Sequence, residues 1–297
     1  MSIDEARKQA QNLHNFQTSA NGVIANNKNH ISHHIRIVGN VVHDAPGAGI
    51  ATCYADYVTI VRNETYRNAF WSPYGSSGIS IYESRDIDHE TGYKNIVFAN
   101  VSHHNREFIP FYMAGTITDG NGIIIDDNKN TQSNKILYGG RTYVAENIVY
   151  MNGGSGIHAY SSQHVDIVHN TAYLNNQEPS LEEGQIFSRP GSDVNIMNNI
   201  LYSALGKPIV WTRDNIGTAT YDYNVLFNGT SESGPHGPHD IYADPGFVSP
   251  ETGDFSLRPD SPAVGSGIPN LASIQDVDGN SYSVPNGGRN RGAGSIR

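Results

Sequence analysis

The segment VDIVHNTAYLN, residues 165–175, sets a pattern that returns along the chain. An apolar residue stands three places before its central asparagine, and an aromatic residue stands three places after it. Aligning the chain with itself on this segment brings seven asparagines into one column: Asn40, Asn63, Asn100, Asn147, Asn170, Asn199 and Asn224. Their separations are 23, 37, 47, 23, 29 and 25 residues, so the pattern indicates a short repeat that tolerates insertions.

A repeat of this length is typical of a solenoid in which every rung contributes short strands. In a parallel β-helix, equivalent residues of successive rungs lie about 4.8 Å apart, so an inward asparagine column can hydrogen-bond along its own length. Aromatic residues at one position can stack in the same way. We interpret His43 and His103, which occupy the aromatic column, as packing residues. The predicted fold class is all-β, a right-handed parallel β-helix.

A second motif, a glycine-rich turn leading into alternating residues, precedes the asparagine segments, as in SSGISIYE (76–83), GNGIIIDD (120–127) and GSGIHAYS (154–161). If the isoleucine after the glycine faces the interior, the next residue faces outward and the alternation continues. The two predicted outward columns are Ala51, Ser80, Ile124, His158, Phe187 and Val210, and then Cys53, Tyr82, Asp126, Tyr160, Arg189 and Thr212.

Composition agrees with a single β domain, because 31 glycines and 17 tyrosines in 297 residues suit short strands and turns. The one cysteine cannot form an internal disulfide, and no apolar stretch is long enough for a transmembrane helix. Ser2 and Glu5 have capping-box spacing and predict a helix over residues 3–14 that lies across the first rung. We therefore expect an N-terminal cap at 1–18, rungs at 19–230 and an irregular C-terminal cap at 231–297.

The net charge of -10 argues against nucleic acid as a partner, because nucleic-acid binding needs a positive surface. The same charge would repel an acidic polysaccharide unless a cation intervened. No signal peptide is visible at the N-terminus.

The rungs, the segment 240–267 (DIYADPGFVSPETGDFSLRPDSPAVGSG) and the ending 288–297 (GRNRGAGSIR) resemble the right-handed parallel β-helix proteins of the pectate lyase superfamily. The resemblance covers about residues 20 to 297. It implies a secreted or periplasmic bacterial protein, expected to be monomeric, that acts on a polysaccharide. Within that superfamily the reaction varies, because lyases, hydrolases, epimerases and binding proteins share the fold. Additional N-terminal rungs are common in such proteins and are absent from this sequence.

The stretch TDGNGIIIDDNKN (118–130) contains the densest group of carboxylates near the predicted outward face. Asp119, Asp126 and Asp127, with Glu83 one rung earlier, would repel one another unless protonated, hydrogen-bonded or neutralised by a cation. Oxygen ligands of this kind suit calcium, so we predict a Ca²⁺ site at these four residues. The alternative is that the aspartate pair closes a turn by accepting backbone amides.

Long insertions precede and follow the rungs of Tyr82 and Asp126, and we expect them to form walls around the outward face. They carry aromatic residues on which sugar rings would stack, among them Trp71 and Tyr74. Tyr82, Tyr160 and Arg213 complete the predicted substrate-binding residues.

The reaction most favoured is cleavage of a uronate-containing polysaccharide by calcium-assisted β-elimination in a groove over these rungs. Lys129, His158, Tyr160 and Arg189 are the candidate bases, and His158 titrates near neutrality without assistance. The alternative is a hydrolase of the polygalacturonase type, which uses Asp126 and Asp127 as acid and base, then His158 and Arg189. The second alternative is a carbohydrate-binding β-helix without catalysis.

Overall fold

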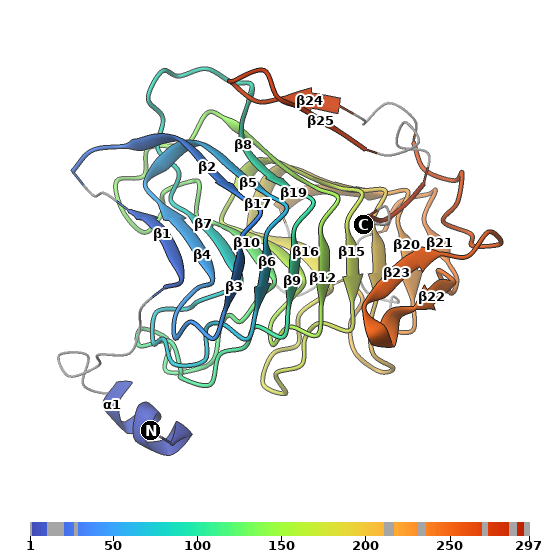
Figure 1. Cartoon of the computed structure of the whole chain (residues 1–297), viewed down its shortest axis with the longest axis horizontal. Coiled ribbons are helices and arrows are strands. Elements are labelled where there is room, and N and C mark those ends of the chain that lie inside the picture. Colours follow the sequence, from blue (N-terminus) through green and yellow to red (C-terminus); the bar gives the residue numbers. More distant parts are fainter. Residues whose placement is uncertain are drawn as a thin grey trace.

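The computed structural model describes residues 2–10, 21–26, 29–210, 217–230, 236–268, 273–284 and 290–293. The chain winds into a right-handed parallel β-helix, as predicted, with three sheets along the axis (Figure 1). In these sheets, which we call A, B and C, each strand pairs in parallel with the equivalent strand of the next rung. Among the described residues, no helix is long and apolar enough to cross a membrane.

Sheet A contains β1 (Val23–Asn26), β4 (Ile50–Cys53), β7 (Ile79–Tyr82), β10 (Ile123–Asp126), β13 (Ile157–Tyr160) and β16 (Ile186–Arg189). Sheet B contains β2 (Ser32–Val38), β5 (Ala55–Val61), β8 (Tyr93–Phe98), β11 (Arg141–Ala145), β14 (Gln163–Val168), β17 (Gly191–Met197) and β19 (Gly217–Asp222). Sheet C contains β3 (Val41–His43), β6 (Glu64–Tyr66), β9 (Val101–His103), β12 (Ile148–Tyr150), β15 (Thr171–Tyr173), β18 (Ile200–Tyr202), β20 (Val225–Phe227) and β21 (Ile241–Tyr242).

The predicted asparagine column forms a ladder at the corner between sheets B and C. Each side-chain amide donates to the carbonyl oxygen of the next asparagine, from Asn40 to Asn63 at 2.9 Å through to Asn199 and Asn224 at 3.1 Å. The residue before each asparagine has positive φ, which turns the chain sharply into sheet C. Six of the seven side chains are buried, and only Asn40 at the end is exposed. The ladder therefore satisfies backbone groups that the corners would leave unpaired.

A second ladder, which the alignment did not identify, lies five residues further along four of the rungs. Asn68, Asn105, Asn152 and Asn175 are linked by amide hydrogen bonds of 2.8–3.0 Å, and Asn175 donates to Gln185 at 3.1 Å. It holds the corner where the chain leaves sheet C for sheet A. Its signal in the sequence is a second asparagine five places after the first.

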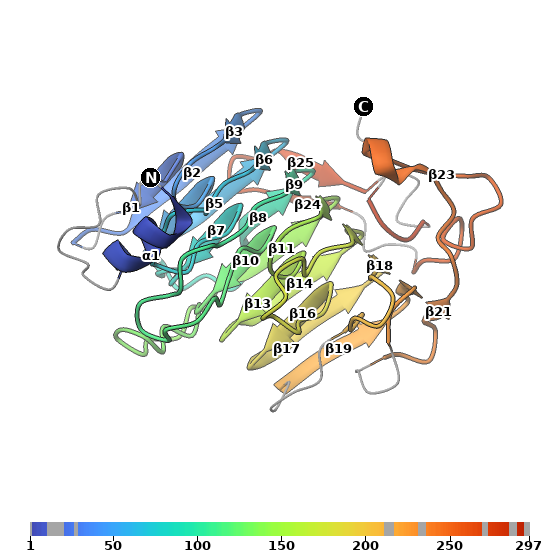
Figure 2. The same ribbon diagram turned by 90° about the horizontal axis from the view of Figure 1, so that it is seen from below.

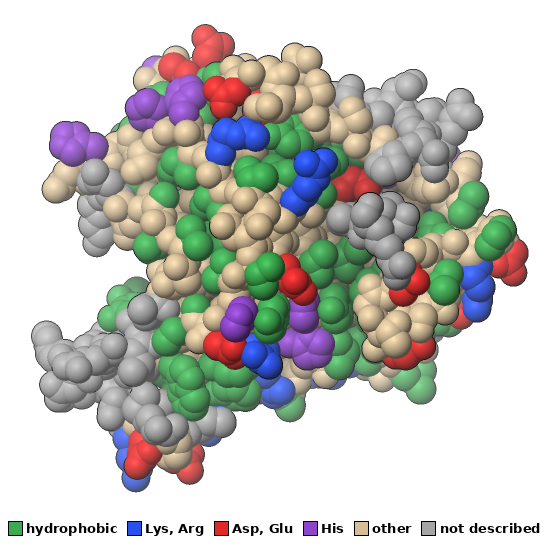
Figure 3. All heavy atoms as spheres, in the orientation of Figure 1, with side chains coloured by type: hydrophobic (Ala, Val, Ile, Leu, Met, Phe, Trp, Pro, Cys, Tyr) green, Lys and Arg blue, Asp and Glu red, His purple; other side chains and the backbone are tan. Residues whose placement is uncertain are grey.

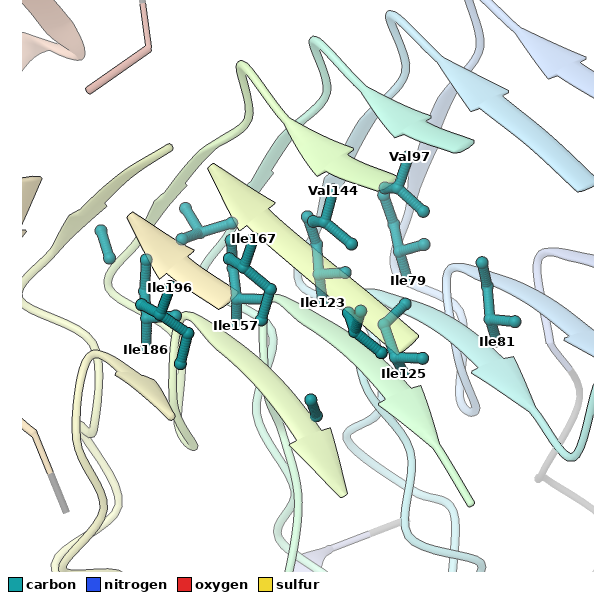
Figure 4. Close-up of a cluster of buried hydrophobic side chains, with 14 of the residues drawn as sticks. Ile79, Ile81, Val97, Ile123, Ile125, Val144, Ile157, Ile167, Ile186 and Ile196 are labelled. Atoms are coloured by element: carbon teal, nitrogen blue, oxygen red, sulfur yellow. The ribbon is translucent and has the colours of Figure 1, made fainter. Parts of the chain in front are cut away.

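The core is a stack of aliphatic side chains between the sheets. Figure 4 shows Ile123 and Ile157 of sheet A facing Val144 and Ile167 of sheet B. All six isoleucines that were predicted to face inward belong to this core: Ile50, Ile79, Ile123, Ile157, Ile186 and Ile209. Burial of each isoleucine contributes roughly 1.5–3 kcal/mol, and this fixes which residues of sheet A face outward.

The aromatic column lies on the outer face of sheet C and stacks as predicted. The rings of His43 and Tyr66 are 4.8 Å apart, and those of His103 and Tyr150 are 4.5 Å apart, nearly parallel in both pairs. Figure 3 shows histidines among acidic and basic side chains on this face. The packing role of His43 and His103 is confirmed.

The N-terminal helix α1 (Ile3–Ala10) begins with the predicted capping box, in which Glu5 accepts the amide of Ser2 at 2.7 Å. Residues 11–14 of the predicted helix lie outside the described residues. In Figure 1, α1 lies below the first rungs, and Arg7 donates to the carbonyl oxygen of Phe108 at 3.0 Å.

The C-terminal segment, expected to be an irregular cap, contains two short hairpins that pack on the sides of the solenoid. β22 (Phe247–Ser249), a 3-10 turn η2 (Pro250–Thr252) and β23 (Asp254–Leu257) place Phe255 against Tyr150 and Tyr173 of sheet C. β24 (Ser273–Gln275) and β25 (Ser281–Ser283) lie over sheet B, where Tyr282 contacts Phe98. Asp276 there pairs with Arg36 of the first rung.

Candidate active site

The outer face of sheet A carries the candidate site, and Figure 2 shows its strands β7, β10, β13 and β16 side by side. Asp126 is in register with Tyr82 on one side and Tyr160 on the other. His158 is in register with Ile124, two residues before Asp126 on the same strand. Ile123 and Ile125 point into the core, so Asp126 and His158 point outward, as the alternation predicted.

The Asp126 carboxylate is half-buried and receives no hydrogen bond from the residues that the structure describes. Burial raises its pKa well above the usual value, and the carboxylates of Asp119, Asp127 and Glu83 raise it further. A carboxyl group in this setting holds its proton to higher pH than an exposed aspartate does, which suits it to act as a general acid.

Asp119 lies on the insertion that leads into β10, four residues before the strand begins. Its carboxylate accepts hydrogen bonds from the Thr118 hydroxyl at 2.8 Å and the Asn121 amide at 3.0 Å. Burial raises its pKa to about 6, although both hydrogen bonds lower it. Asp119 is therefore mostly ionised at neutral pH, and the environment of Asp126 also raises its pKa; carboxyl groups with separately shifted pKa values are typical of an acid and base pair.

Glu107, which the sequence reasoning missed, fixes the backbone beside Asp119. Its fully buried carboxylate accepts the amide hydrogens of Ser76 at 2.8 Å and Asp119 at 3.1 Å. Burial and the nearby Asp119 raise the pKa of Glu107 well above its usual value. Glu107 thus ties the two insertions before β7 and β10 together.

Glu183, the second residue that was missed, stands three places before β16. Its carboxylate accepts the amide hydrogen of Ser155 at 3.2 Å. Burial and the charge of Asp119 raise its pKa to about 8. The sequence carries a signal for this residue. Glu183 stands directly before the glycine that opens a sheet A motif, as Asp119 does in the motif of β10.

His158 is only 6% exposed, and neither ring nitrogen has a hydrogen-bond partner among the described residues. Its ring stacks on Phe187 with the centroids 4.0 Å apart. Burial, together with the charge of Arg189, lowers its pKa to about 3. The imidazole is therefore neutral at any physiological pH.

Asp127 and Glu83 do not join the outward carboxylates. Both have positive φ and occupy the corner after a strand of sheet A, where the chain turns toward sheet B. Asp127 is fully buried and accepts hydrogen bonds from the amides of Thr131 and Gln132 at 2.9 and 2.8 Å, which is the turn-closing alternative. Glu83 is also fully buried and pairs with Arg85 at 3.0 Å. The four predicted calcium ligands therefore do not form one ligand set in this arrangement.

The other predicted residues fall in three places. Lys129 lies in the turn after β10, half-buried, and burial lowers the pKa of its amine. Arg189 ends β16, in register with Tyr160. Arg213 lies outside the described residues.

The insertions border sheet A on both sides. Tyr74 and Tyr112, each 48% exposed, meet edge to face at 5.8 Å where the strands of the sheet begin. Trp71 is half-buried on the same insertion as Tyr74. Where the strands end, the turns 83–92 and 127–140 are joined by a hydrogen bond of 2.9 Å between Arg85 and Ser133.

One group of three carboxylates in the described part of the chain has metal-ligand spacing, with Asp56, Asp86 and Asp88 within 4.8 Å of one another. The ammonium group of Lys94 already lies among them, at 2.6, 2.6 and 2.7 Å. Burial lowers the pKa of Lys94, but the three carboxylates outweigh it and the pKa is raised. Lys94 thus takes the place that a cation would occupy.

No known protein family matches the sequence, and no curated protein is similar to it.

Proposed function

We propose that the protein is a polysaccharide-degrading enzyme and that glycosidic bonds are hydrolysed over the outer face of sheet A. The observation that carries this proposal is Asp126, a half-buried carboxyl group with a raised pKa and no hydrogen-bond partner among the described residues. Tyrosines flank it on both neighbouring rungs. The parallel β-helix, and the resemblance of its rungs to the pectate lyase superfamily, add a fold that often acts on extended sugar chains.

In this proposal Asp126 donates its proton to the glycosidic oxygen as the bond to the leaving sugar breaks. Asp119, ionised above a pKa of about 6, accepts a proton from the attacking water. Tyr82 and Tyr160 contact the sugars on either side of the bond that is cleaved. Glu183, with a pKa of about 8, stays protonated near neutrality and can hydrogen-bond to a sugar hydroxyl. A polysaccharide substrate also favours action outside the cytoplasm.

A second candidate is β-elimination of a uronate-containing polysaccharide. The lowered pKa of Lys129 favours it, because elimination needs a base. Burial lowers the pKa of the Lys129 amine, which increases the fraction that can accept a proton. The neutral imidazole of His158 is an alternative base. Asp119 and Asp126 would then help to hold a calcium ion against the substrate carboxylate.

Product analysis separates these reactions. The protein is incubated with neutral and acidic polysaccharides, with calcium or with a chelator, and both reducing ends and near-ultraviolet absorbance are measured. Hydrolysis yields reducing ends without the chromophore of an unsaturated sugar, whereas elimination yields both. If wild-type protein produces neither from any polysaccharide to which it binds, it is a carbohydrate-binding β-helix and the enzymatic proposal is wrong.

A further inference from the structure

A pocket of about 470 Å³ lies beside sheet A, next to the ends of β4, β7 and β10. Residues 29–31, Tyr54 and the turns at 84–89 and 130–138 contribute to its lining. Tyr54 also contacts Tyr82 edge to face at 6.0 Å, so the pocket adjoins the candidate active site. Its volume is within the range of sites for small ligands and is large enough for one or two sugar rings.

The wall of the pocket that contains Tyr138 is held in place by the cluster of Lys94 with Asp56, Asp86 and Asp88. The Tyr138 hydroxyl donates to Asp56 at 2.7 Å, and the Gly139 amide donates to Asp86 at 2.9 Å. Lys94 joins both aspartates from β8. Because these groups are buried and paired, the pocket is largely formed before a ligand enters, which reduces the entropy cost of binding.

The polar groups of the pocket include donors and acceptors that the protein leaves unused. Arg85 lies over the Tyr54 ring at 5.0 Å, and its Nη2 is held by Glu83 and Ser133 at 3.0 and 2.9 Å. Its Nε is buried without a partner, and so is the Oδ1 of Asn130, a residue that is only 1% exposed. Unsatisfied buried polar atoms are rare in folded proteins, and both of these belong to residues that line the pocket.

The rim of the pocket is apolar. Ile136 and Leu137 lie on the turn that follows β10, and they are 63% and 57% exposed. Adjacent exposed aliphatic side chains of this size can cover the C–H face of a sugar ring. The charged and titratable groups that line the pocket are Arg85, Asp86, His30, His89, Tyr54 and Tyr138. Asp86 is paired with Lys94, and Arg85 is paired through Nη2 with the buried Glu83.

We propose that this pocket binds an acidic sugar unit, carrying a carboxylate or a sulfate, of the polysaccharide that lies over sheet A. This inference rests on the proposed function and names a binding site beside the catalytic residues. The guanidinium of Arg85 holds the anionic group, since arginine presents several donors in one plane and no acceptor. Ile136 and Leu137 contact the ring. Glu83 takes only one nitrogen of Arg85, so the remaining donors of the guanidinium let a protein with a net charge of -10 accept an acidic group at this place.

The test measures binding by calorimetry in the Asp126→Asn background, which prevents turnover. The probes are tetragalacturonate, a sulfated κ-carrageenan tetrasaccharide and neutral galactotetraose. We expect at least one acidic probe to bind about tenfold or more tightly than the neutral one, and the two acidic probes distinguish carboxylate from sulfate. Arg85→Lys, which keeps the charge beside Glu83, should remove most of that preference.

Leu137→Trp fills the pocket from an exposed position and should weaken the acidic probe about tenfold without a change in melting temperature. Leu205→Trp, at a site that is 86% exposed and outside the pocket, is the matched control and should change nothing. Equal affinity for all three probes, or unchanged affinity in both pocket variants, overturns the proposal. A wild type that binds the acidic probe in this pocket but cleaves no polysaccharide would refute the proposed function alone.

Discussion

Replacing Asn147 by alanine tests whether the asparagine ladder holds the corners of the solenoid. Its Oδ1 accepts hydrogen bonds from the backbone and side-chain nitrogens of Asn100, both at 2.9 Å. Its Nδ2 donates to the carbonyl oxygen of Val97 at 3.0 Å and to Oδ1 of Asn170 at 2.9 Å. The substitution removes all four bonds and leaves the buried backbone N–H of Asn100 without its acceptor.

One buried donor without a partner costs about 1–3 kcal/mol, and the remaining lost bonds each contribute about 0.5–1.5 kcal/mol. Relaxation recovers part of this sum, because Nδ2 of Asn100 keeps the carbonyl oxygen of Ile60 at 2.9 Å. We expect Asn147→Ala to lower the free energy of unfolding by about 2–4 kcal/mol. The exposed Asn40, at the end of the ladder, donates to Asn63 but accepts no ladder bond, so Asn40→Ala should cost less than about 1 kcal/mol.

The assay is urea unfolding of wild type and both variants, followed by far-ultraviolet circular dichroism. The slopes with denaturant must be compared first, because a solenoid can unfold in parts. A loss in Asn147→Ala that is no larger than the loss in Asn40→Ala would refute the reasoning.

Three further predictions concern charge. Asp126→Asn should reduce turnover at least about 100-fold, and full turnover in this variant would contradict the site. The substitution should not lower the melting temperature at pH 7. The reason is that a carboxyl group whose pKa rises on folding weakens the fold as the pH increases above about 4. The dependence of kcat/KM on pH should be bell-shaped, rising as Asp119 ionises near a pKa of about 6 and falling at higher pH as Asp126 loses its proton. A flat profile would count against the pair. Lys94→Met should destabilise the protein by about 3–5 kcal/mol, because Asp56 and its two neighbours lose their counter-charge, and calcium should restore much of the melting temperature only in this variant. An equal response to calcium in wild type would show that the ion acts elsewhere.

The repeat made the fold predictable from the sequence, because the residues that define it have one environment in every rung. Asn147 and Asn170 align without knowledge of the coordinates, and the alternation of Ile123, Ile125 and Asp126 gives the direction of each side chain. These are local rules with a period of two along a strand.

Residues at the corners and in the insertions followed no such rule. Asp127 is adjacent to Asp126 in sequence, but a positive φ turns it away from the outer face and into hydrogen bonds with its own turn. Glu107 reaches the site through an insertion whose path depends on contacts with the loop before β7. Lys94 and Asp56 lie on the paired strands β8 and β5, but Asp88 reaches Lys94 from the insertion between β7 and β8, and no spacing in the sequence encodes that contact.

The pairing of Arg36 with Asp276 joins two residues that are 240 positions apart, and Tyr282 donates from the same hairpin to Asp276. In most solenoids each repeat touches only its neighbours, so terminal repeats can be lost one at a time. Here the β24–β25 hairpin, which follows all the rungs in sequence, binds the first rung, so that rung gains these interactions only after the ribosome has made the whole solenoid. Removing the β24–β25 hairpin would therefore loosen the first rung, although the two are far apart in sequence.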